Sequence, residues 1–281
     1  MLWAGLKQPF NILMHLIEYE IHQGMKTKRL LIGFLSLISI LSCEKDNDIK
    51  QIEGNVENAR LKRILLYSSA DSEEPICIVD EYEYDSLNRV SKVSSPWYKE
   101  GEIVGTIKYD SYMYNSIGQL ERISNYNANL NSPNGFINLK NYIYTYSDNG
   151  LKIKELIEYP QISSFEYTLF SYSGNQLIKT EKYNDADELE AYTKYEYNDI
   201  GELIKEISYS ANDIEFSVVI NTYVNGLNTL TEMYTGNQEN KIREIYKTYD
   251  SNGNLIMIES NELMPYSSLL SHVLRYEYYE D

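Results

Sequence analysis

Hydrophobic and polar residues alternate along most of this chain, in stretches of eight to ten residues. In residues 189–197, leucine, alanine, threonine and two tyrosines share one side, while glutamate, lysine and a further tyrosine fill the other. Tyr142, Tyr144 and Tyr146 form the same stripe two residues apart. A period of two in segments rich in Tyr, Ile and Thr is typical of half-buried antiparallel strands.

Most of these stripes end at a tyrosine that is followed by a small polar turn and a new aliphatic strand start. Such tyrosines recur every 25 to 32 residues, and a turnless eighth copy ends the chain at residues 276–278. A unit of this length cannot bury its own apolar face, so neighbouring units must stack. The seven tyrosines before turns are Tyr84, Tyr114, Tyr146, Tyr172, Tyr197, Tyr223 and Tyr249.

The residues after each tyrosine predict a hairpin turn. Asp or Asn caps the turn through its side chain, and Gly three residues later supplies a positive φ, as in residues 250–253. In the first copy Asn88 replaces the glycine, and Asn is the next best residue for that conformation. In the copies at Tyr146, Tyr172 and Tyr223 we expect turns of other lengths.

The hairpins together predict an all-β fold. One opening strand, two strands for each of seven hairpins and one closing strand give an antiparallel meander of about 16 strands. Open sheets of more than about ten strands tend to curl, split or close. We therefore expect a sheet curled or closed into a large barrel, not a sandwich. The array begins and ends with half a repeat, so its first and last strands could pair.

A strand count of this size also occurs in outer-membrane pores, whose strands alternate apolar residues outward with polar residues inward. The charges here do not segregate in that way. In residues 151–159, Lys152, Lys154 and Glu158 lie on one side of the predicted strand and Glu155 lies on the other. This pattern favours a water-soluble barrel over an inserted pore.

The N-terminal region predicts export. Basic residues follow Met25, a twelve-residue apolar run spans 30–41, and Cys43 comes directly after it. The run is too short for a transmembrane helix and fits a secretory signal. The segment resembles a bacterial lipoprotein signal, which implies that Cys43 is lipidated and anchors the mature chain to a membrane. Leu41 is bulkier than that pattern prefers, and an ordinary cleaved signal with an incidental cysteine is the alternative.

The chain divides into four predicted parts. Residues 1–24 precede the signal, so we expect translation to start at Met25; residues 25–42 are the signal, 43–58 a polar tether and 59–281 one β domain. A lysine followed by acidic residues after the cysteine resembles the tag that sends lipoproteins to the outside of the outer membrane. We expect a lipid-anchored, surface-exposed protein, with the periplasmic face as the alternative.

Charge and chemistry exclude several functions. With 25 basic and 42 acidic residues the chain has a net charge of −17, which disfavours nucleic acid as a partner. Cys77 lies in an apolar strand and fits a small buried hydrophobe, and His272 is the single histidine after the signal. The turn at residues 250–254 lacks calcium-loop spacing, because its glycine comes fourth instead of sixth, and the acidic segment 184–188 could hold only an adventitious cation. We expect no enzyme activity, cofactor or metal.

Two copies of the repeat carry a further resemblance. Residues 249–255 read Tyr-Asp-Ser-Asn-Gly-Asn-Leu, and residues 84–90 match this with Asn for Gly and Val for Leu. The pattern resembles the YD (RHS-type) repeat family over roughly residues 60–281. Long members of that family form β-spiral shells around a toxin domain. This chain looks more like small secreted lipoproteins with degenerate repeats, some with a porin-like barrel fold, and the resemblance supplies no catalytic residues.

Binding is expected at the rim opposite the tyrosine turns, where the connections vary. Three of these connections, residues 94–101, 126–136 and 261–266, carry aromatic residues beside Asn or Pro. Variable loops on a rigid scaffold are common binding sites. An aromatic ring can stack on a sugar while neighbouring amides bond its hydroxyls, so we expect a glycan site. The alternative is a structural role, in which Trp97 closes the end of the barrel. The predicted ligand-binding residues are Trp97, Tyr98, Tyr126, Phe136 and Tyr266.

The sequence therefore predicts a non-enzymatic envelope lipoprotein that binds a glycan or a partner protein. Two alternatives remain: a structural scaffold of the envelope without a small ligand, and, least favoured, a glycan-acting hydrolase that uses paired carboxylates.

Overall fold

The computed structural model describes residues 60–99, 102–129, 132–236, 238–263 and 272–279. The predicted extension, signal and tether, with Cys43, lie outside these residues, as does Tyr266. The described part consists of strands and turns without an α-helix. The strands are β1 (Leu61–Tyr67), β2 (Cys77–Tyr84), β3 (Val90–Lys99), β4 (Glu102–Tyr114), β5 (Leu120–Ala128), β6 (Phe136–Tyr146), β7 (Lys152–Tyr159), β8 (Ser164–Ser173), β9 (Gln176–Tyr183), β10 (Leu189–Tyr197), β11 (Leu203–Ser210), β12 (Glu215–Val224), β13 (Leu227–Thr235), β14 (Asn240–Tyr249), β15 (Leu255–Glu262) and β16 (His272–Tyr278).

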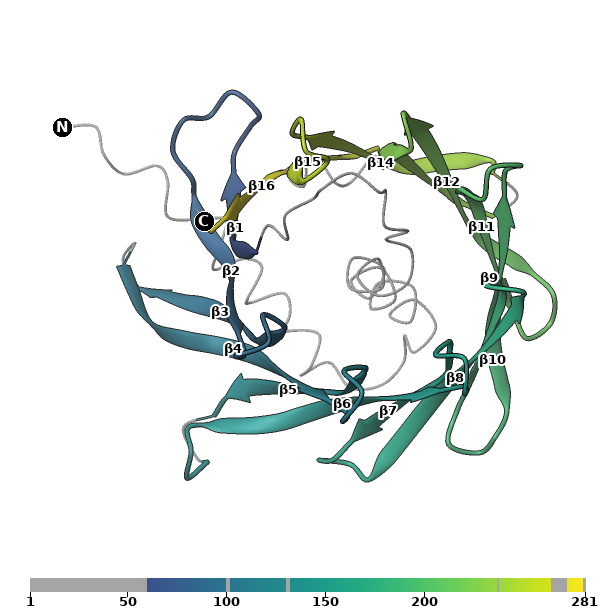
Figure 1. Ribbon diagram of the computed structural model, residues 1–281, viewed down its shortest axis with the longest axis horizontal. Coiled ribbons are helices and arrows are strands. Elements are labelled where there is room, and N and C mark those ends of the chain that lie inside the picture. The colour runs from purple at the N-terminus through teal and green to yellow at the C-terminus, as the bar shows by residue number, and fades with distance from the viewer. Residues whose placement is uncertain (1–59, 100–101, 130–131, 237, 264–271, 280–281) are drawn as a thin grey trace, which may run out of the picture. The chain divides into compact units, whose positions relative to one another are not determined.

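These sixteen strands form one closed barrel in which each strand pairs antiparallel with the next. Figure 1 looks down the ring, where β16 returns beside β1. In that closing pair Ile64 lies opposite Tyr276, and Leu66 lies opposite Leu274. The predicted meander of 16 strands and the pairing of its two ends are confirmed, and of the two predicted shapes the barrel is closed. Closure leaves the ring without the unpaired edge strands that an open sheet would have.

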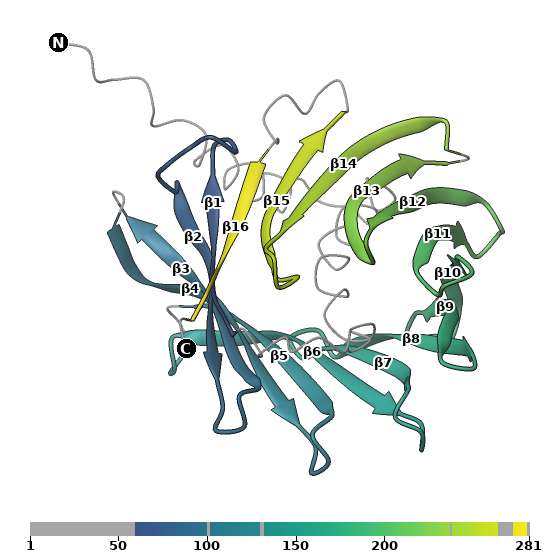
Figure 2. The same cartoon turned by 45° about the horizontal axis from the view of Figure 1, so that its top comes forward.

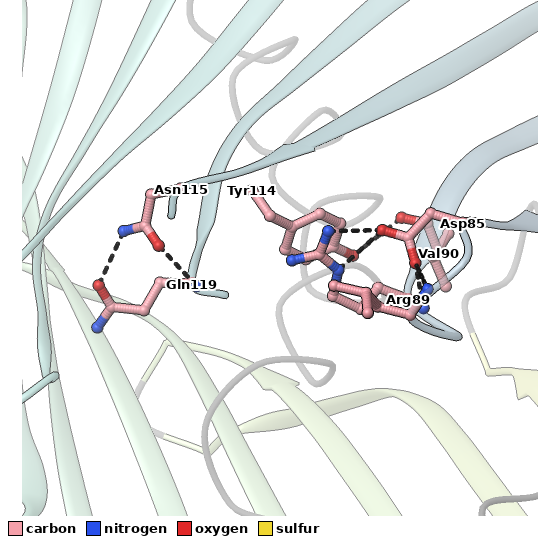
Figure 3. Close-up of polar contacts among 7 residues, drawn as sticks. Asp85, Arg89, Val90, Tyr114, Asn115 and Gln119 are labelled. Atoms are coloured by element: carbon pink, nitrogen blue, oxygen red, sulfur yellow. Dashed lines mark hydrogen bonds and ion pairs between the residues drawn. The ribbon is translucent and has the colours of Figure 1, made fainter. Parts of the chain in front are cut away.

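The predicted turn chemistry is present in the hairpins that carry the full motif. In one of them, the side-chain oxygen of Asn115 accepts hydrogen bonds from the backbone N–H groups of Ile117 at 3.1 Å and Gln119 at 2.9 Å. Gly118 has a φ of +89°. Figure 3 shows this turn beside the preceding one. There Asn88 takes the glycine position with a φ of +58°, as predicted.

The predicted variation in turn length is right in two copies and wrong in one. The turns after Tyr172 and Tyr223 have two residues each, with positive φ at Gly174 in the first and at both residues of 225–226 in the second. These are the turn conformations that fit the twist of a hairpin. The turn after Tyr146 instead has the common geometry, because Gly150 has a φ of +85° and donates to the carbonyl of the residue after the tyrosine at 2.9 Å.

A β-bulge accompanies each of the seven tyrosine turns. The register shifts at the tyrosine in every hairpin, so that the following strand carries one extra residue. Three of these extra residues are exposed isoleucines, Ile153, Ile178 and Ile256. The bulge lets the tyrosine and the first residue of the next strand face the same side. Bulges also bend a strand and increase its twist, which helps a sheet to close.

The tyrosines before the turns tie neighbouring strands together. The hydroxyl of Tyr114 donates to the carbonyl of Val90 at 2.9 Å, as Figure 3 shows. Tyr278 makes the equivalent bond to Leu255 at 2.8 Å in the closing half-repeat. A hydrogen bond of this kind contributes about 0.5–1.5 kcal/mol. The same bond, at 2.7 to 3.1 Å, is made by Tyr84, Tyr146, Tyr172, Tyr197, Tyr223 and Tyr249.

Both faces of the sheet carry charge. We call the side of the pre-turn tyrosines the tyrosine face and the other side the opposite face. On the tyrosine face, Glu166 and Lys182 form an ion pair at 2.9 Å, and on the opposite face Lys179 and Glu181 are 2.7 Å apart. Neither face is therefore the continuous apolar band that lipid requires.

Two clusters of buried side chains lie where the two ends of the sheet meet. On the tyrosine face of β1, the buried Ile64 packs with Tyr82 and Val93. On the opposite face, the buried Leu65 packs with Val273. Buried side chains therefore pack on both faces of the sheet at β1, which stabilises the closure of the barrel.

Candidate functional site

The two ends of the barrel differ. The turn rim consists of the tyrosine turns, and the far rim consists of the other connections, which include residues 68–76, 129–135 and 160–163. The predicted long connections of the far rim are largely strand: β3 runs to Lys99, and β5 and β6 extend to Ala128 and from Phe136. The loop prediction was wrong there because these strands pair beyond the ring of their neighbours.

The predicted residues Trp97 and Tyr98 lie in the projecting part of the β3–β4 hairpin, at the left of Figure 1 and Figure 2. Trp97 pairs across the hairpin with Gly105 and is 49% exposed, which is too open for a plug of the barrel end. The Tyr98 hydroxyl accepts a hydrogen bond from the backbone N–H of Ile78 at 2.7 Å. Tyr98 therefore ties β3 to β2, and Trp97 presents an open indole.

The structure brings two other predicted residues, Tyr126 and Phe136, around a third ring. Tyr126 stacks on Tyr109 with 4.7 Å between ring centroids and 14° between planes, and Phe136 meets Tyr109 edge-on at 4.9 Å. The Lys92 ammonium lies 5.4 Å from the centre of the Tyr109 ring. We call Tyr109, Tyr126 and Phe136 the aromatic shelf. It is half-buried, so part of each ring faces solvent.

Two more tyrosine stacks follow around the barrel. Tyr167 stacks on Tyr183 at 5.1 Å, and Tyr192 stacks on Tyr209 at 4.9 Å. In both stacks one hydroxyl is engaged, because Tyr192 donates to Asp213 at 2.7 Å and Tyr167 makes the corresponding bond to an aspartate at 3.0 Å. The hydrogen bond to the Asp213 carboxylate raises the pKa of Tyr192 to about 12. Each of these stacks therefore uses one of its two hydroxyls within the fold.

The aromatic shelf differs from the other stacks in its polar groups. The hydroxyls of Tyr109 and Tyr126 hydrogen-bond to no residue that the structure describes. Asn138, the cross-strand partner of Tyr126, has a buried side-chain oxygen that accepts no hydrogen bond from the described chain. Burial raises the pKa of Tyr109, so its hydroxyl stays protonated at neutral pH. The shelf combines apolar ring surface with hydroxyls that are free to bond a ligand.

Sequence reasoning missed Tyr109 although the chain carries a signal for it. Tyr109 and Tyr126 flank the same turn, residues 115–119, and they are direct register partners. The other stacked pairs flank their turns in the same way. The bulge beside each turn shifts the register by one residue, so a simple count outward from the turn misaligns the two rings.

Among the residues that the structure describes, the reactive side chains do not gather into one centre. Cys77 is half-buried, and burial raises the pKa of its thiol, which disfavours the nucleophilic thiolate. His272 lies opposite Ser260 in the last strand pair. In the acidic segment 184–188 the Asn184 side chain accepts two backbone N–H groups, which is the ordinary turn geometry. Within the described ranges no three His, Cys, Asp or Glu residues group as metal ligands do.

Comparison with known proteins supports the fold. No protein-family model matches the chain, and no curated protein matches its sequence. A porin-like protein from Bacteroides uniformis is similar with a TM-score of 0.50 and 12% identity, over 78% of this chain and 98% of that one. At this identity the likeness shows a shared barrel fold, as the porin-like resemblance predicted.

Two further solved structures are similar at a lower level. A porin-like protein from Bacteroides vulgatus has a TM-score of 0.38 and 11% identity, over 79% of this chain and 99% of that one. The TcdB2-TccC3-Cdc42 structure has a TM-score of 0.30 and 14% identity, over 69% of this chain and 9% of that one. At TM-scores this low, neither similarity supports a conclusion about this chain.

The described residues contain no helix that is long and apolar enough to cross a membrane.

Proposed function

We propose that this protein is a lipid-anchored, non-enzymatic binding protein of the bacterial cell envelope, and that its ligand is a glycan bound at the aromatic shelf. The proposal rests on the ring surfaces and hydroxyl groups of the shelf that make no hydrogen bond within the described chain. The centroid of the Tyr109 ring lies within 5 Å of those of both Tyr126 and Phe136, and the hydroxyls of Tyr109 and Tyr126 have no partner in the described chain. Ring faces stack on the apolar face of a sugar, and hydroxyls bond its OH groups.

The proposed location follows from the surface of the barrel and from the N-terminal signal. Because both faces of the sheet carry ion pairs, the barrel stands in water, and a lipid at Cys43 holds it at the membrane. The porin-like fold of the B. uniformis protein supports an envelope location. We place the barrel on the outside of the outer membrane. Changing Cys43→Ala should release the protein from membranes, and protease added to intact cells should cut the anchored form.

Membership of the YD-repeat family is part of the proposal. It is supported by the shared tyrosine bond and by the turns whose Asp or Asn caps two backbone N–H groups, as Asp250 does at 2.9 and 2.8 Å. In this reading the Tyr, Asp and Gly residues of the repeat build the barrel. They are not a catalytic set, which supports binding without a reaction.

The proposal is tested by ligand screening of the full chain in detergent on a glycan array. A bound glycan should lose at least tenfold in affinity when Tyr126→Ala removes the stacked ring of the shelf, which corresponds to about 1.4 kcal/mol. Tyr183→Ala removes the equivalent ring from another stack and serves as the matched control. The proposal fails if no glycan binds, or if Tyr183→Ala weakens binding as much as Tyr126→Ala. Absence of any ligand would favour the scaffold alternative.

A further inference from the structure

We infer that the outer edge of β4, residues 102–107, pairs with the same edge of a second copy of this chain, so that the barrels associate as two-fold dimers. This inference is independent of the glycan proposal.

The first observation is an unpaired strand edge. β4 pairs with β3 from Glu102 onward, but it pairs with β5 only from Lys108, which lies opposite Asn127. Along residues 102–107 one side of β4 therefore has no strand beside it among the described residues. In Figures 1 and 2 this part of the hairpin stands away from the ring. A closed barrel otherwise removes its edges, and an open edge is a template for another strand.

The second observation is that the other edge of the same hairpin is protected. Pro96 in β3 has no backbone N–H to offer a neighbouring strand. Tyr98 reaches from that strand to the backbone of Ile78. Proline on an edge is a common means of preventing strand addition. Residues 102–107 of β4 contain neither a proline nor such a tie, so the hairpin is open on one side only.

The third observation is exposed apolar surface on the open edge. Ile103 and Val104 are each 51% exposed, and Ile107 is 38% exposed. β-branched residues of this kind favour strand pairing and are costly to leave in water. Gly105 separates them, and a Cβ placed on it would meet nothing within 4 Å, so a second backbone can approach closely there.

The residues of the edge select a second copy as the partner. An antiparallel pair centred on Gly105 places Ile103 of one copy opposite Ile107 of the other. At each end of this pair, the side chain of Glu102 of one copy comes beside that of Lys108 of the other, where β5 begins to pair with β4. Both charged side chains are exposed and available for this pairing. Opposite charges and β-branched residues in facing positions stabilise a strand pair. A parallel pair in register would instead place glutamate against glutamate and lysine against lysine.

The same geometry limits the assembly to two copies. A two-fold axis through Gly105 uses the open edge of each chain once, and such an isologous contact is closed. The register of β4 against β3 also shifts at two places in this segment, with Val104 and Ile107 as the extra residues. Bulges twist an edge and discourage long runs of added strands.

Cysteine cross-linking in membranes from cells that produce the full chain tests the register. In a Cys77→Ala background, Gly105→Cys should form a disulfide-linked dimer, because facing Cα atoms in such a pair lie about 4.5–5.5 Å apart. Met113→Cys is the matched control, since it is 53% exposed on the same strand but lies where β5 pairs. Cells that carry Ile103→Cys and Ile107→Cys on separate copies should give the mixed dimer, whereas Ile103→Cys alone should not cross-link. The Cys77→Ala chain alone should remain uncross-linked.

Charge reversal tests the partner. Glu102→Lys and Lys108→Glu should each weaken the dimer at least tenfold in sedimentation velocity, and the double variant should restore it because the two charges exchange places. Neither variant touches the aromatic shelf, so glycan binding should persist when dimerisation is lost. The inference is overturned if the full chain stays monomeric, if Gly105→Cys cross-links no better than Met113→Cys, if the double variant fails to recover, or if Gly105→Cys captures a different protein.

Discussion

The turn rim and the far rim of this barrel are built from the same strands but follow different rules. On the turn rim every pre-turn tyrosine bonds a neighbouring backbone carbonyl, and capped turns such as that of Asn115 satisfy their own N–H groups. On the far rim the connections vary, a hairpin projects, and indole and isoleucine side chains lie open at Trp97 and Ile103. The polar groups of the repeat residues form hydrogen bonds within the fold, whereas side chains outside the repeat remain exposed and available for binding. This difference is the reason why we propose binding at the far rim.

The largest contrast should appear when one tyrosine is removed from each rim. Tyr114→Ala deletes a ring that carries the bond to Val90 and lies 4.3 Å from the Arg89 guanidinium, and it should reduce the free energy of unfolding by about 3 kcal/mol. Tyr126→Ala deletes a half-buried ring whose hydroxyl is free, and it should cost about 1 kcal/mol. Urea unfolding followed by tyrosine fluorescence measures both.

A conservative change separates the two contributions of the turn-rim ring. Tyr114→Phe keeps the ring and removes the bond to Val90, so it should cost about 1 kcal/mol. Tyr126→Phe should be neutral in stability, because its hydroxyl bonds no described residue. Equal losses for Tyr114→Ala and Tyr126→Ala would remove the distinction between the rims.

A smaller contrast should appear for glycine. Gly118 has a φ of +89° with open space around it, so Gly118→Val should cost about 1–3 kcal/mol through backbone strain alone. Gly105→Val on the far rim also meets open space, but its φ lies outside the left-handed region, so the stability of the monomer should change by less than about 0.5 kcal/mol. Thermal unfolding at a concentration that keeps the chain monomeric compares the two. A destabilising Gly105→Val would mean that its backbone, too, needs glycine.

Much of the turn rim could be predicted from the sequence because each turn is a local device. The capping residue, the glycine and the tyrosine lie within five residues of one another, and the alternation of the flanking residues sets the faces. The count of 16 strands follows from counting the turns, and the half-repeats at the two ends show that the first and last strands could pair, although the sequence leaves a curled and a closed sheet both open. The prediction of another turn length at Tyr146 was wrong, because Gly150 follows its tyrosine by four residues, as Gly253 follows Tyr249. The Ser147 hydroxyl replaces the usual Asp or Asn cap and accepts the Leu151 N–H at 3.1 Å.

The far rim could be predicted only in part because its arrangement depends on register between strands. Tyr126 and Phe136 were expected to bind a ligand, but the ring that joins them, Tyr109, comes from a third strand. Trp97 was expected in a loop, but it lies in strand β3. The preceding Pro96 is compatible with this strand because, among the described residues, β3 has no neighbouring strand on one side there, so the missing backbone N–H leaves no hydrogen bond unmade. Contacts of this kind depend on bulges that period-two patterning does not reveal.

The smallest contrast lies in the pH dependence of two aspartates, one in a turn and one in the barrel wall. Hydrogen bonds from the Arg89 side chain, and from the backbone N–H groups of Arg89 and Leu87, lower the pKa of Asp85. Burial raises the pKa of Asp110, against a weaker opposing effect of the bond from Asn125. A carboxyl with a lowered pKa stabilises the fold above its unfolded pKa and loses that contribution as pH falls. A carboxyl with a raised pKa has the opposite sign.

The two aspartates therefore predict opposite slopes when stability is measured from about pH 6 to about pH 2. Asp85→Asn keeps the cap, since Asn115 fills the same position in the next repeat, but it loses the charge. The advantage of the wild-type chain over Asp85→Asn should shrink as pH falls, because protonation removes the ion pair with Arg89. Relative to Asp110→Asn, the wild-type chain should instead gain stability as pH falls, because protonation relieves a buried charge. Slopes of the same sign would mean that the barrel wall shifts the pKa of Asp110 in the same direction as the turn shifts that of Asp85. Burial in the wall would then not disfavour the charged carboxylate.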